Sequence, residues 1–352
     1  MNIDDIDTPA VIIDLDKVAA NLAAAQNYAD QHGLALRPHV KTHKLARFAQ
    51  DQIGLGAIGI TAQKLGEAED MANGGINDIF LPYNILGAAK LNRLLALHNR
   101  VKLSVTADSS AVVDGYETFF KDPGNPLAVL VECDTGAGRC GVQTREQAVT
   151  LARQIDTAPG LTFAGLMTYP PQGKTMAVQE FLTSAIAALT AASLPPAIIS
   201  SGGTPDLMRA AKVSAATEYR PGTYIYGDRM QVAWGHGTLE NCALTVLATV
   251  VSRPTPDRAI LDSGSKALAA DTCQVPGHGH LVEFPDAVVT ALSEEHAIVD
   301  LSACSERPEV GARLHVIPNH CCVVTNLFDT VHLMRGAEVE SEARITSRGK
   351  LS

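Results

Sequence analysis

The chain has 352 residues, of which 46% are hydrophobic, and its 28 Lys and Arg against 38 Asp and Glu give a formal net charge of −10. An acidic chain without a basic run is a poor candidate for binding nucleic acid or an anionic membrane surface, so we expect a small-molecule substrate. No apolar stretch reaches the roughly 18 residues of a membrane span, and the start MNIDDIDTPA does not resemble a signal peptide. The seven cysteines show no regular spacing, which fits a reducing compartment, and we expect a cytoplasmic protein.

The first three-fifths of the chain alternate apolar runs with helix-like stretches. Residues 10–13 predict a strand, followed by a helix capped near Asp16. Apolar strands that alternate with helices are typical of a parallel sheet covered on both faces. The eight runs between Leu34 and Tyr224 are LALRPHV, AIGITAQ, DIFLPYN, VKLSVTA, LAVLVECD, LTFAGLMTY, PAIISSGG and TEYRPGTY. They predict an α/β fold with a (β/α)8 TIM-type barrel, in which chemistry gathers at the carboxyl ends of the strands.

After Gly227 the pattern changes to β-type runs separated by turn residues. These runs are CALTVLATVVSR, RAILDSG, HAIVDLS, ARLHVIP and VHLMRG. They predict a mostly antiparallel β domain. We therefore place the barrel at residues 13–227 and the C-terminal β domain, joined by the N-terminal strand, at residues 1–12 and 228–352.

Lys41 directly follows the first barrel run and has His39, His43 and Lys44 beside it. A lysine at a barrel mouth can form a Schiff base when desolvation and nearby cations lower its pKa, because only the neutral amine reacts. The alternative is an ordinary surface lysine in a polar loop, which the position alone favours.

A glycine-containing loop, Ser200-Ser201-Gly202-Gly203-Thr204-Pro205-Asp206, ends the seventh run and leads into a helix-like stretch. Backbone N–H groups in such a loop bind anions, and barrel loops after strands seven and eight often hold phosphate. Together with a strand-end lysine, a phosphate site suggests pyridoxal 5′-phosphate.

His320 and Cys322 lie in the segment Pro318-Asn319-His320-Cys321-Cys322, after a strand-like run. If the strand continued, the two side chains would share one face, and imidazole with thiolate suits zinc, with cobalt or manganese as options. Two ligands leave room for water or substrate, as a Lewis-acid catalyst requires. The alternative is a core histidine beside two buried thiols.

Five segments, RPHVKTHK, VECDTGAGRCGV, SSGGTP, TEYRPGTYIYGD and PNHCC, together resemble the fold-type III pyridoxal-phosphate enzymes, specifically the D-threonine aldolase and D-serine dehydratase family. The resemblance runs from about Thr8 to Asp329. It implies an alanine-racemase-type barrel followed by a β domain, and a homodimer. The implied cofactors are pyridoxal 5′-phosphate and a divalent metal, zinc or manganese, with cobalt or magnesium as further options.

The resemblance also implies a role for each site residue. Lys41 would bond covalently to the cofactor, and Tyr169, also a catalytic candidate, would line it. Arg139 would contact the cofactor's phenolic oxygen, and Arg220 has the position that faces the pyridine nitrogen in alanine racemases. The remaining implied cofactor contacts are Gln63, Ser201, Gly202, Gly203, Thr204, Gly222, Thr223 and Tyr224, and the implied metal ligands are His320 and Cys322.

Two reactions of the family remain open, both on β-hydroxy D-amino acids. We expect retro-aldol cleavage to glycine and an aldehyde, on overall resemblance, and the alternative is β-elimination to a 2-oxo acid and ammonia. Two departures favour the alternative: Cys322 replaces an aspartate of some aldolases, and Thr175 stands six residues beyond Tyr169, where aldolases have a histidine. The base could then be His43, Lys174, His296 or a metal-bound hydroxide.

A racemase and a non-catalytic cofactor-binding protein are further alternatives. Racemases need a second acid/base group, usually a tyrosine of the β domain, and no tyrosine follows Gly227. The about 120 residues beyond Gly227 argue against a single-domain carrier.

Overall fold

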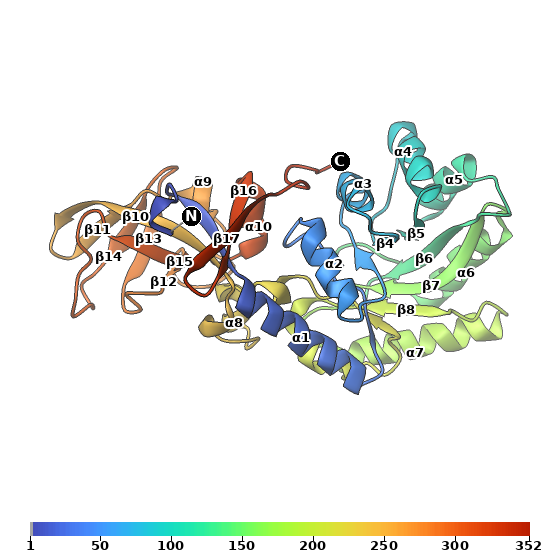
Figure 1. Cartoon of the computed structure of the whole chain (residues 1–352). Coiled ribbons are helices and arrows are strands. Elements are labelled where there is room, and N and C mark those ends of the chain that lie inside the picture. Colours follow the sequence, from blue (N-terminus) through green and yellow to red (C-terminus); the bar gives the residue numbers. More distant parts are fainter. Residues whose placement is uncertain (1–2) are drawn as a thin grey trace. The chain divides into compact units, whose positions relative to one another are not determined.

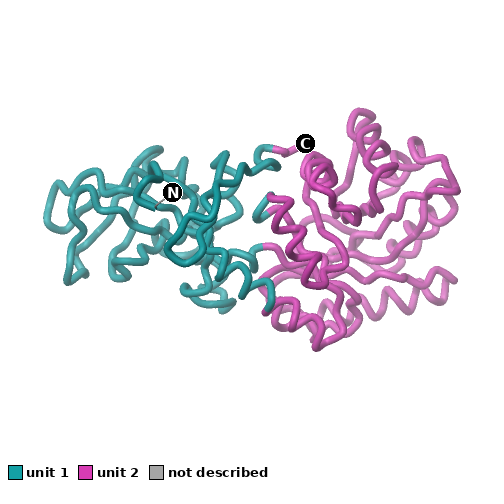
Figure 2. Tube along the Cα trace, viewed as in Figure 1, with its two compact units in different colours: residues 1–23, 42–44, 223–349 teal, residues 24–41, 45–222, 350–352 magenta. Residues whose placement is uncertain are grey.

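The computed structural model describes residues 3–352, which form two compact units (Figure 2). Unit 1 comprises residues 1–23, 42–44 and 223–349, and unit 2 comprises residues 24–41, 45–222 and 350–352. The division cuts helix α1, Leu15–Gln31, and falls close to the predicted boundary at residue 227. Among the helices described, none is both long and apolar enough to cross a bilayer.

Unit 2 contains a parallel eight-stranded sheet in the order β2-β9-β8-β7-β6-β5-β4-β3. A further bridge between His39 and Thr61 links the chain after β2 to β3, so the first and last strands of this order also meet. Each of the eight predicted runs contains one strand, and the predicted barrel is confirmed. The strands are β2 Ala35–Leu36, β3 Ile60–Thr61, β4 Asp78–Leu81, β5 Lys102–Ala107, β6 Leu127–Cys133, β7 Leu161–Thr168, β8 Ile198–Ser201 and β9 Glu218–Tyr219.

Helices lie on the outer side of these strands (Figure 1). The helix α6, Arg145–Thr157, shows why: Thr144 and Gln147 form a capping box at its start, and its buried residues recur at helical spacing. Those buried residues are Ala148, Leu151, Ala152 and Ile155. The other elements are α2 Ala46–Gly54, α3 Leu65–Asn73, α4 Ala88–His98, α5 Ser110–Phe119, α6 Arg145–Thr157, α7 Thr175–Ala191 and the 3-10 segment η2 Thr204–Lys212.

Unit 1 contains the second sheet, in which every pairing is antiparallel except that of β1 with β16. Strand β1 lies between β10 and β16, so the N-terminal strand belongs to this sheet. The strands are β1 Ala10–Asp14, β10 Leu244–Thr255, β11 Arg258–Leu261, β12 His280–Leu281, β13 Val288–Leu292, β14 Ala297–Asp300, β15 Arg313–Ile317, β16 Thr330–Arg335 and β17 Glu338–Arg344. The short helices are η1 Ile3–Asp5, η3 Thr223–Ile225, α8 Arg229–Ala233, η4 Leu239–Asn241, α9 Ser265–Leu268 and α10 Cys321–Leu327.

Of two local predictions, one was confirmed and one was wrong. The helix α1, expected to be capped near Asp16, is capped by Asp14, whose Oδ1 accepts the N–H groups of Asp16 and Lys17 at 3.0 and 3.1 Å. His320 and Cys322 do not continue a strand, because β15 ends before Pro318 and His320 is the N-cap of α10. Proline has no N–H for the ladder, and the chain turns into a helix whose first turn holds Cys322.

Candidate functional site

The chain leaving β2 brings Lys41 together with Gln63. Lys41 is half-buried, and its backbone N–H donates to His39 Nδ1 at 3.3 Å. His39 Nε2 in turn lies 3.0 Å from the side-chain oxygen of Gln63, which follows β3. The ends of β2 and β3 thus position the predicted lysine and one predicted cofactor contact on one hydrogen-bonded path.

Arg139 and Tyr169, from the loops after β6 and β7, stack on each other. The guanidinium carbon lies 4.7 Å from the centre of the Tyr169 ring, and a Cβ on Gly203 would lie 3.2 Å from that ring. Glu132, near the end of β6, places a carboxylate oxygen 4.0 Å from Arg139 Nη2. Burial raises the pKa of Glu132 to about 7, although Arg139 and Arg220 oppose that shift.

Sequence reasoning missed Glu132. Its signal was a carboxylate inside the apolar run LAVLVECD, two residues before the aspartate that ends the run. A charged residue in a strand that is buried on both faces needs a cationic partner, and here the partner is Arg139.

Arg220 is buried inside the barrel at the end of β9. Its Nε donates to Ser200 Oγ at 2.8 Å, and its Nη2 donates to the Thr168 carbonyl oxygen at 2.6 Å. Burial lowers the pKa of Arg220 to about 10, while Glu218 and Glu132 favour its charged form. The side chain therefore presents a fixed positive charge in the barrel at neutral pH.

The predicted phosphate loop combines close backbone approach with an unpartnered hydroxyl. Gly202 has a φ of +142°, and a Cβ there would lie 2.5 Å from the backbone nitrogen of Arg220. Ser201 Oγ is buried and has no hydrogen-bond partner among the described residues. Thr204 Oγ1 accepts the Gly222 N–H at 3.1 Å. A buried hydroxyl without a partner, next to a position where a side chain would clash with the backbone, fits a site for an anionic ligand.

Thr223 and Tyr224 belong to unit 1, with the predicted metal ligands. Thr223 Oγ1 lies 3.6 Å from Cys322 Sγ, and Thr42 Oγ1 lies 3.2 Å from the same sulfur. Thr42 is the residue after Lys41, so the predicted lysine and a contact of the predicted metal ligand are adjacent in the chain.

His320 and Cys322 lie at the start of α10, where buried Asp228 accepts the Cys321 N–H at 3.1 Å. Burial raises the pKa of Asp228 to about 6. Burial opposes protonation of His320, but its hydrogen bond with Cys322 and the nearby Asp228 and Asp271 raise the pKa of His320 overall. An imidazole with a thiol and carboxylates has the donor chemistry of a zinc site.

Two further donors lie beside His320, and the sequence analysis did not single them out as ligands. The donor atoms of Asp271, Cys273 and His320 all lie within 4.8 Å of one another. No short motif joins these residues, because nearly fifty positions separate the loop from the helix.

The three candidate bases have different surroundings. Lys174 is exposed and is the N-cap of α7 in unit 2. His43 is fully buried in unit 1, and His296 is exposed between β13 and β14. Thr175, at the position where aldolases have a histidine, is the first residue of α7.

The chain matches known families over most of its length. Residues 13–230 match the model of the alanine racemase N-terminal domain, and residues 243–334 match a putative serine dehydratase domain. A D-threonine aldolase of Arthrobacter sp is 36% identical, over 98% of this chain and 93% of that protein. The chain belongs to the D-threonine aldolase and D-serine dehydratase family.

Both reaction types occur among the members of this family that resemble the chain. A D-threo-3-hydroxyaspartate dehydratase of Delftia sp. (strain HT23) is 31% identical over 92% of this chain and 93% of that protein. The crystal structure of D-threonine aldolase from Filomicrobium marinum superposes with a TM-score of 0.93 and 28% identity, covering 100% of this chain and 98% of that one.

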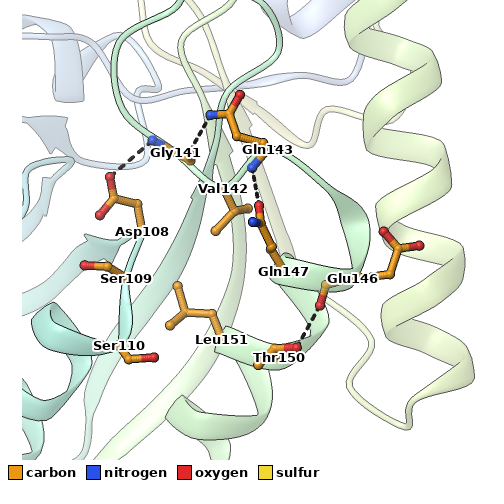
Figure 3. Close-up of a pocket in the computed structure, with 10 residues that line it drawn as sticks. All are labelled: Asp108, Ser109, Ser110, Gly141, Val142, Gln143, Glu146, Gln147, Thr150 and Leu151. Carbon is orange, nitrogen blue, oxygen red and sulfur yellow. Dashed lines mark hydrogen bonds between the residues drawn. The ribbon is translucent and has the colours of Figure 1, made fainter.

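A cavity of about 430 Å³ lies in unit 2, between the end of β5 and the start of α6 (Figure 3). On one side is Asp108, whose Oδ2 accepts the Gly141 N–H at 3.2 Å, and on the other is the start of α6, where the Gln143 N–H donates to Gln147 Oε1 at 2.7 Å. None of the predicted site residues, all of which are described, lines this cavity. Gly141 and Val142, which line the cavity, follow Arg139 in the segment VECDTGAGRCGV, but the predicted cofactor contacts themselves lie outside its lining.

Proposed function

We propose that the chain is a pyridoxal-phosphate-dependent lyase that cleaves β-hydroxy D-amino acids with the help of a divalent metal ion. One observation supports this most: Thr42, the residue after the predicted cofactor lysine, lies 3.2 Å from the sulfur of Cys322, a predicted metal ligand. A racemase does not need a metal ligand near its cofactor lysine. A lyase that must activate a β-hydroxyl group does, because the metal ion is the Lewis acid for that group.

The barrel residues fit the cofactor. Ser201, Gly202 and Gly203 would hold its phosphate, because the loop offers a buried unpartnered hydroxyl and backbone that a side chain would block. Lys41 would hold its aldehyde carbon, and when bound the cofactor supplies an electron sink for a carbanion. Arg139 would favour the ionised form of the cofactor's phenolic oxygen.

The unit 1 residues fit a metal ion. His320 and Cys322 are the proposed ligands, and a bound ion would supply a Lewis acid for the substrate's hydroxyl group. Asp228 keeps Cys321 and the helix start in place through a hydrogen bond to the backbone.

Elimination is the second candidate reaction. The missing histidine favours it, because retro-aldol cleavage needs a base for the hydroxyl proton, whereas elimination needs a base for the Cα proton, which the Lys41 amine can take. If the reaction is retro-aldol cleavage, Lys174 is the candidate base that belongs to the same unit as Tyr169. It lies one residue before Thr175, the position of the missing histidine.

Product analysis separates the two reactions. The purified protein, supplied with pyridoxal 5′-phosphate and zinc or manganese, is incubated with D-threonine, D-serine and D-3-hydroxyaspartate, with the L-enantiomers as controls. Glycine with an aldehyde supports cleavage, and ammonia with a 2-oxo acid supports elimination. If no D-substrate yields either pair of products, the lyase proposal is wrong.

We infer from the family resemblance that the protein forms a homodimer, and analytical ultracentrifugation tests this inference. A single species at 37.1 kDa would contradict the proposal.

A further inference from the structure

A strained loop between α9 and β12 lies beside the proposed metal ligands. Three of its residues that are not glycine have left-handed backbone angles: φ is +63° at Ala269, +50° at Cys273 and +61° at Gln274. Such angles are unfavourable for residues with a Cβ and persist where the surroundings hold them in place. The loop therefore needs an anchor.

Asn319 is that anchor. Its side chain is buried, and its Nδ2 lies within hydrogen-bonding distance of three loop carbonyl oxygens. These belong to Asp271, Thr272 and Gly277, at 3.3, 3.4 and 2.8 Å. Arg229 completes the anchor: its Nη1 donates to Asn319 Oδ1 at 2.6 Å and its Nη2 donates to the Pro276 carbonyl oxygen at 2.9 Å. Since His320 follows Asn319, the same residue that fixes the loop also fixes the start of α10.

The anchored loop brings two potential ligands to His320. Asp271 Oδ2 lies 3.9 Å from His320 Nδ1, and the Cys273 sulfur belongs to the same group of donors within 4.8 Å. Tetrahedral zinc with bonds of about 2.0 to 2.3 Å requires donor atoms roughly 3.3 to 3.8 Å apart. A shift of about 1 Å in the loop would bring these three donors to that spacing, and Cys322, which lies outside this group, already hydrogen-bonds with His320.

We propose that Asp271 and Cys273 join His320 and Cys322 in a four-donor tetrahedral site that takes zinc. The inference rests on the metal site of the proposed function and adds two ligands to it. Two thiolates, an imidazole and a carboxylate select zinc over manganese or magnesium, which prefer oxygen donors. Four protein ligands close the ion's shell, so a substrate hydroxyl gains access only when a loop ligand leaves, and exposed Asp271 is the one that water can replace.

Cobalt substitution counts the thiolates. The full-length protein is stripped with a chelator and titrated with Co²⁺, whose absorption from sulfur-to-metal charge transfer grows with the number of bound thiolates. We expect the variant Cys273→Ser to lose about half of that absorption and, in competition with zinc, to bind it roughly tenfold more weakly or worse. Asp271→Asn should weaken zinc binding while keeping the full absorption. Cys140→Ser, which removes an exposed thiol of unit 2, is the matched control and should behave as wild type.

Alkylation of the wild-type protein tests the same point without a variant. Bound zinc should protect Cys273 from iodoacetamide, as judged by mass spectrometry, and chelation should restore its labelling. If zinc leaves Cys273 labelling unchanged and Co²⁺ shows the absorption of one thiolate, the four-donor site is wrong while the two-ligand proposal stands. If the wild-type protein binds neither ion, or Cys322→Ser binds both as well as wild type does, the metal site of the proposed function is itself wrong.

Discussion

The two units hold their candidate functional groups by different means. In unit 2, Glu132 and Arg220 are fixed by neighbouring parallel strands, whose paired backbones set the position of every strand end. In unit 1, His320 and Cys322 lie at a helix start, and their neighbours come from a strained loop held mainly by Asn319. Residues at the strand ends are held by the backbone hydrogen bonds of the whole barrel. The positions of the loop residues depend on only a few hydrogen bonds. Cofactor and metal binding should therefore fail separately.

Replacing Lys41 should have the largest effect and should be confined to the cofactor site. Lys41→Ala removes the amine that we propose bonds to the cofactor, so turnover should fall by roughly three orders of magnitude or more. Borohydride reduction followed by mass spectrometry should attach the cofactor to Lys41 in the wild type only. Lys121→Ala, at an exposed position beyond α5, is the control. If Lys41→Ala keeps full cofactor absorbance and turnover, Lys41 does not bond to the cofactor.

Removing the charge of Glu132 should change how stability depends on pH. Burial raises the pKa of Glu132 from 4.5 to about 7 in the folded chain, with Asp108 and Asp134 acting in the same direction and Arg139 and Arg220 opposing. The neutral form's contribution is thus fully present below about pH 4.5 and is lost as the pH rises to about 7.

The measurement compares the wild type with Glu132→Gln, which cannot ionise. Between these pH values the wild type should lose on the order of 3 kcal/mol of unfolding free energy relative to the variant. Denaturant titrations at several pH values give the difference. Parallel curves for the two proteins would show that Glu132 stays ionised in the fold.

A side chain at Gly202 should damage the cofactor site through the backbone. Gly202→Ala places a Cβ 2.5 Å from the backbone nitrogen of Arg220, whereas Gly87→Ala, also at a positive φ of +88°, meets nothing within 4 Å. We expect Gly202→Ala to lower the unfolding free energy by about 2 kcal/mol more than Gly87→Ala and to weaken cofactor binding, with zinc affinity unchanged. Equal losses in the two variants would mean that backbone strain alone, without the close contact, explains the effect.

The contrast between the units also explains what the sequence could predict. The barrel was predictable because each strand is an apolar run. Parallel strand ends meet at one edge, which brings Lys41 and Gln63 to one pair of neighbouring loops and Arg139 and Tyr169 to another. Strand β17 was missed because its sequence EVESEAR alternates charged residues and buries only part of one face.

The metal region shows where sequence reasoning stops. The expectation of a strand at His320 failed because periodicity does not show that Pro318 ends β15 and that a helix starts three residues later, at Cys321. Asp271 and Cys273 were not predicted as ligands because a left-handed loop anchored by one buried amide leaves no periodic signal. Such contacts come from tertiary hydrogen bonds between distant segments.

Removing the side chain of Asn319, which anchors the loop of the proposed metal site, should have the smallest and most selective effect of the four substitutions. Asn319→Ala removes the hydrogen bonds to three loop carbonyl oxygens, so the loop that carries Asp271 and Cys273 should relax away from His320. We expect zinc affinity to fall about tenfold, as for other groups that orient ligands, while cofactor affinity stays at the wild-type value. Zinc competition titrations and cofactor absorbance titrations measure the two separately. A parallel loss of cofactor binding would show that the two sites are coupled, against the separation that their different supports imply.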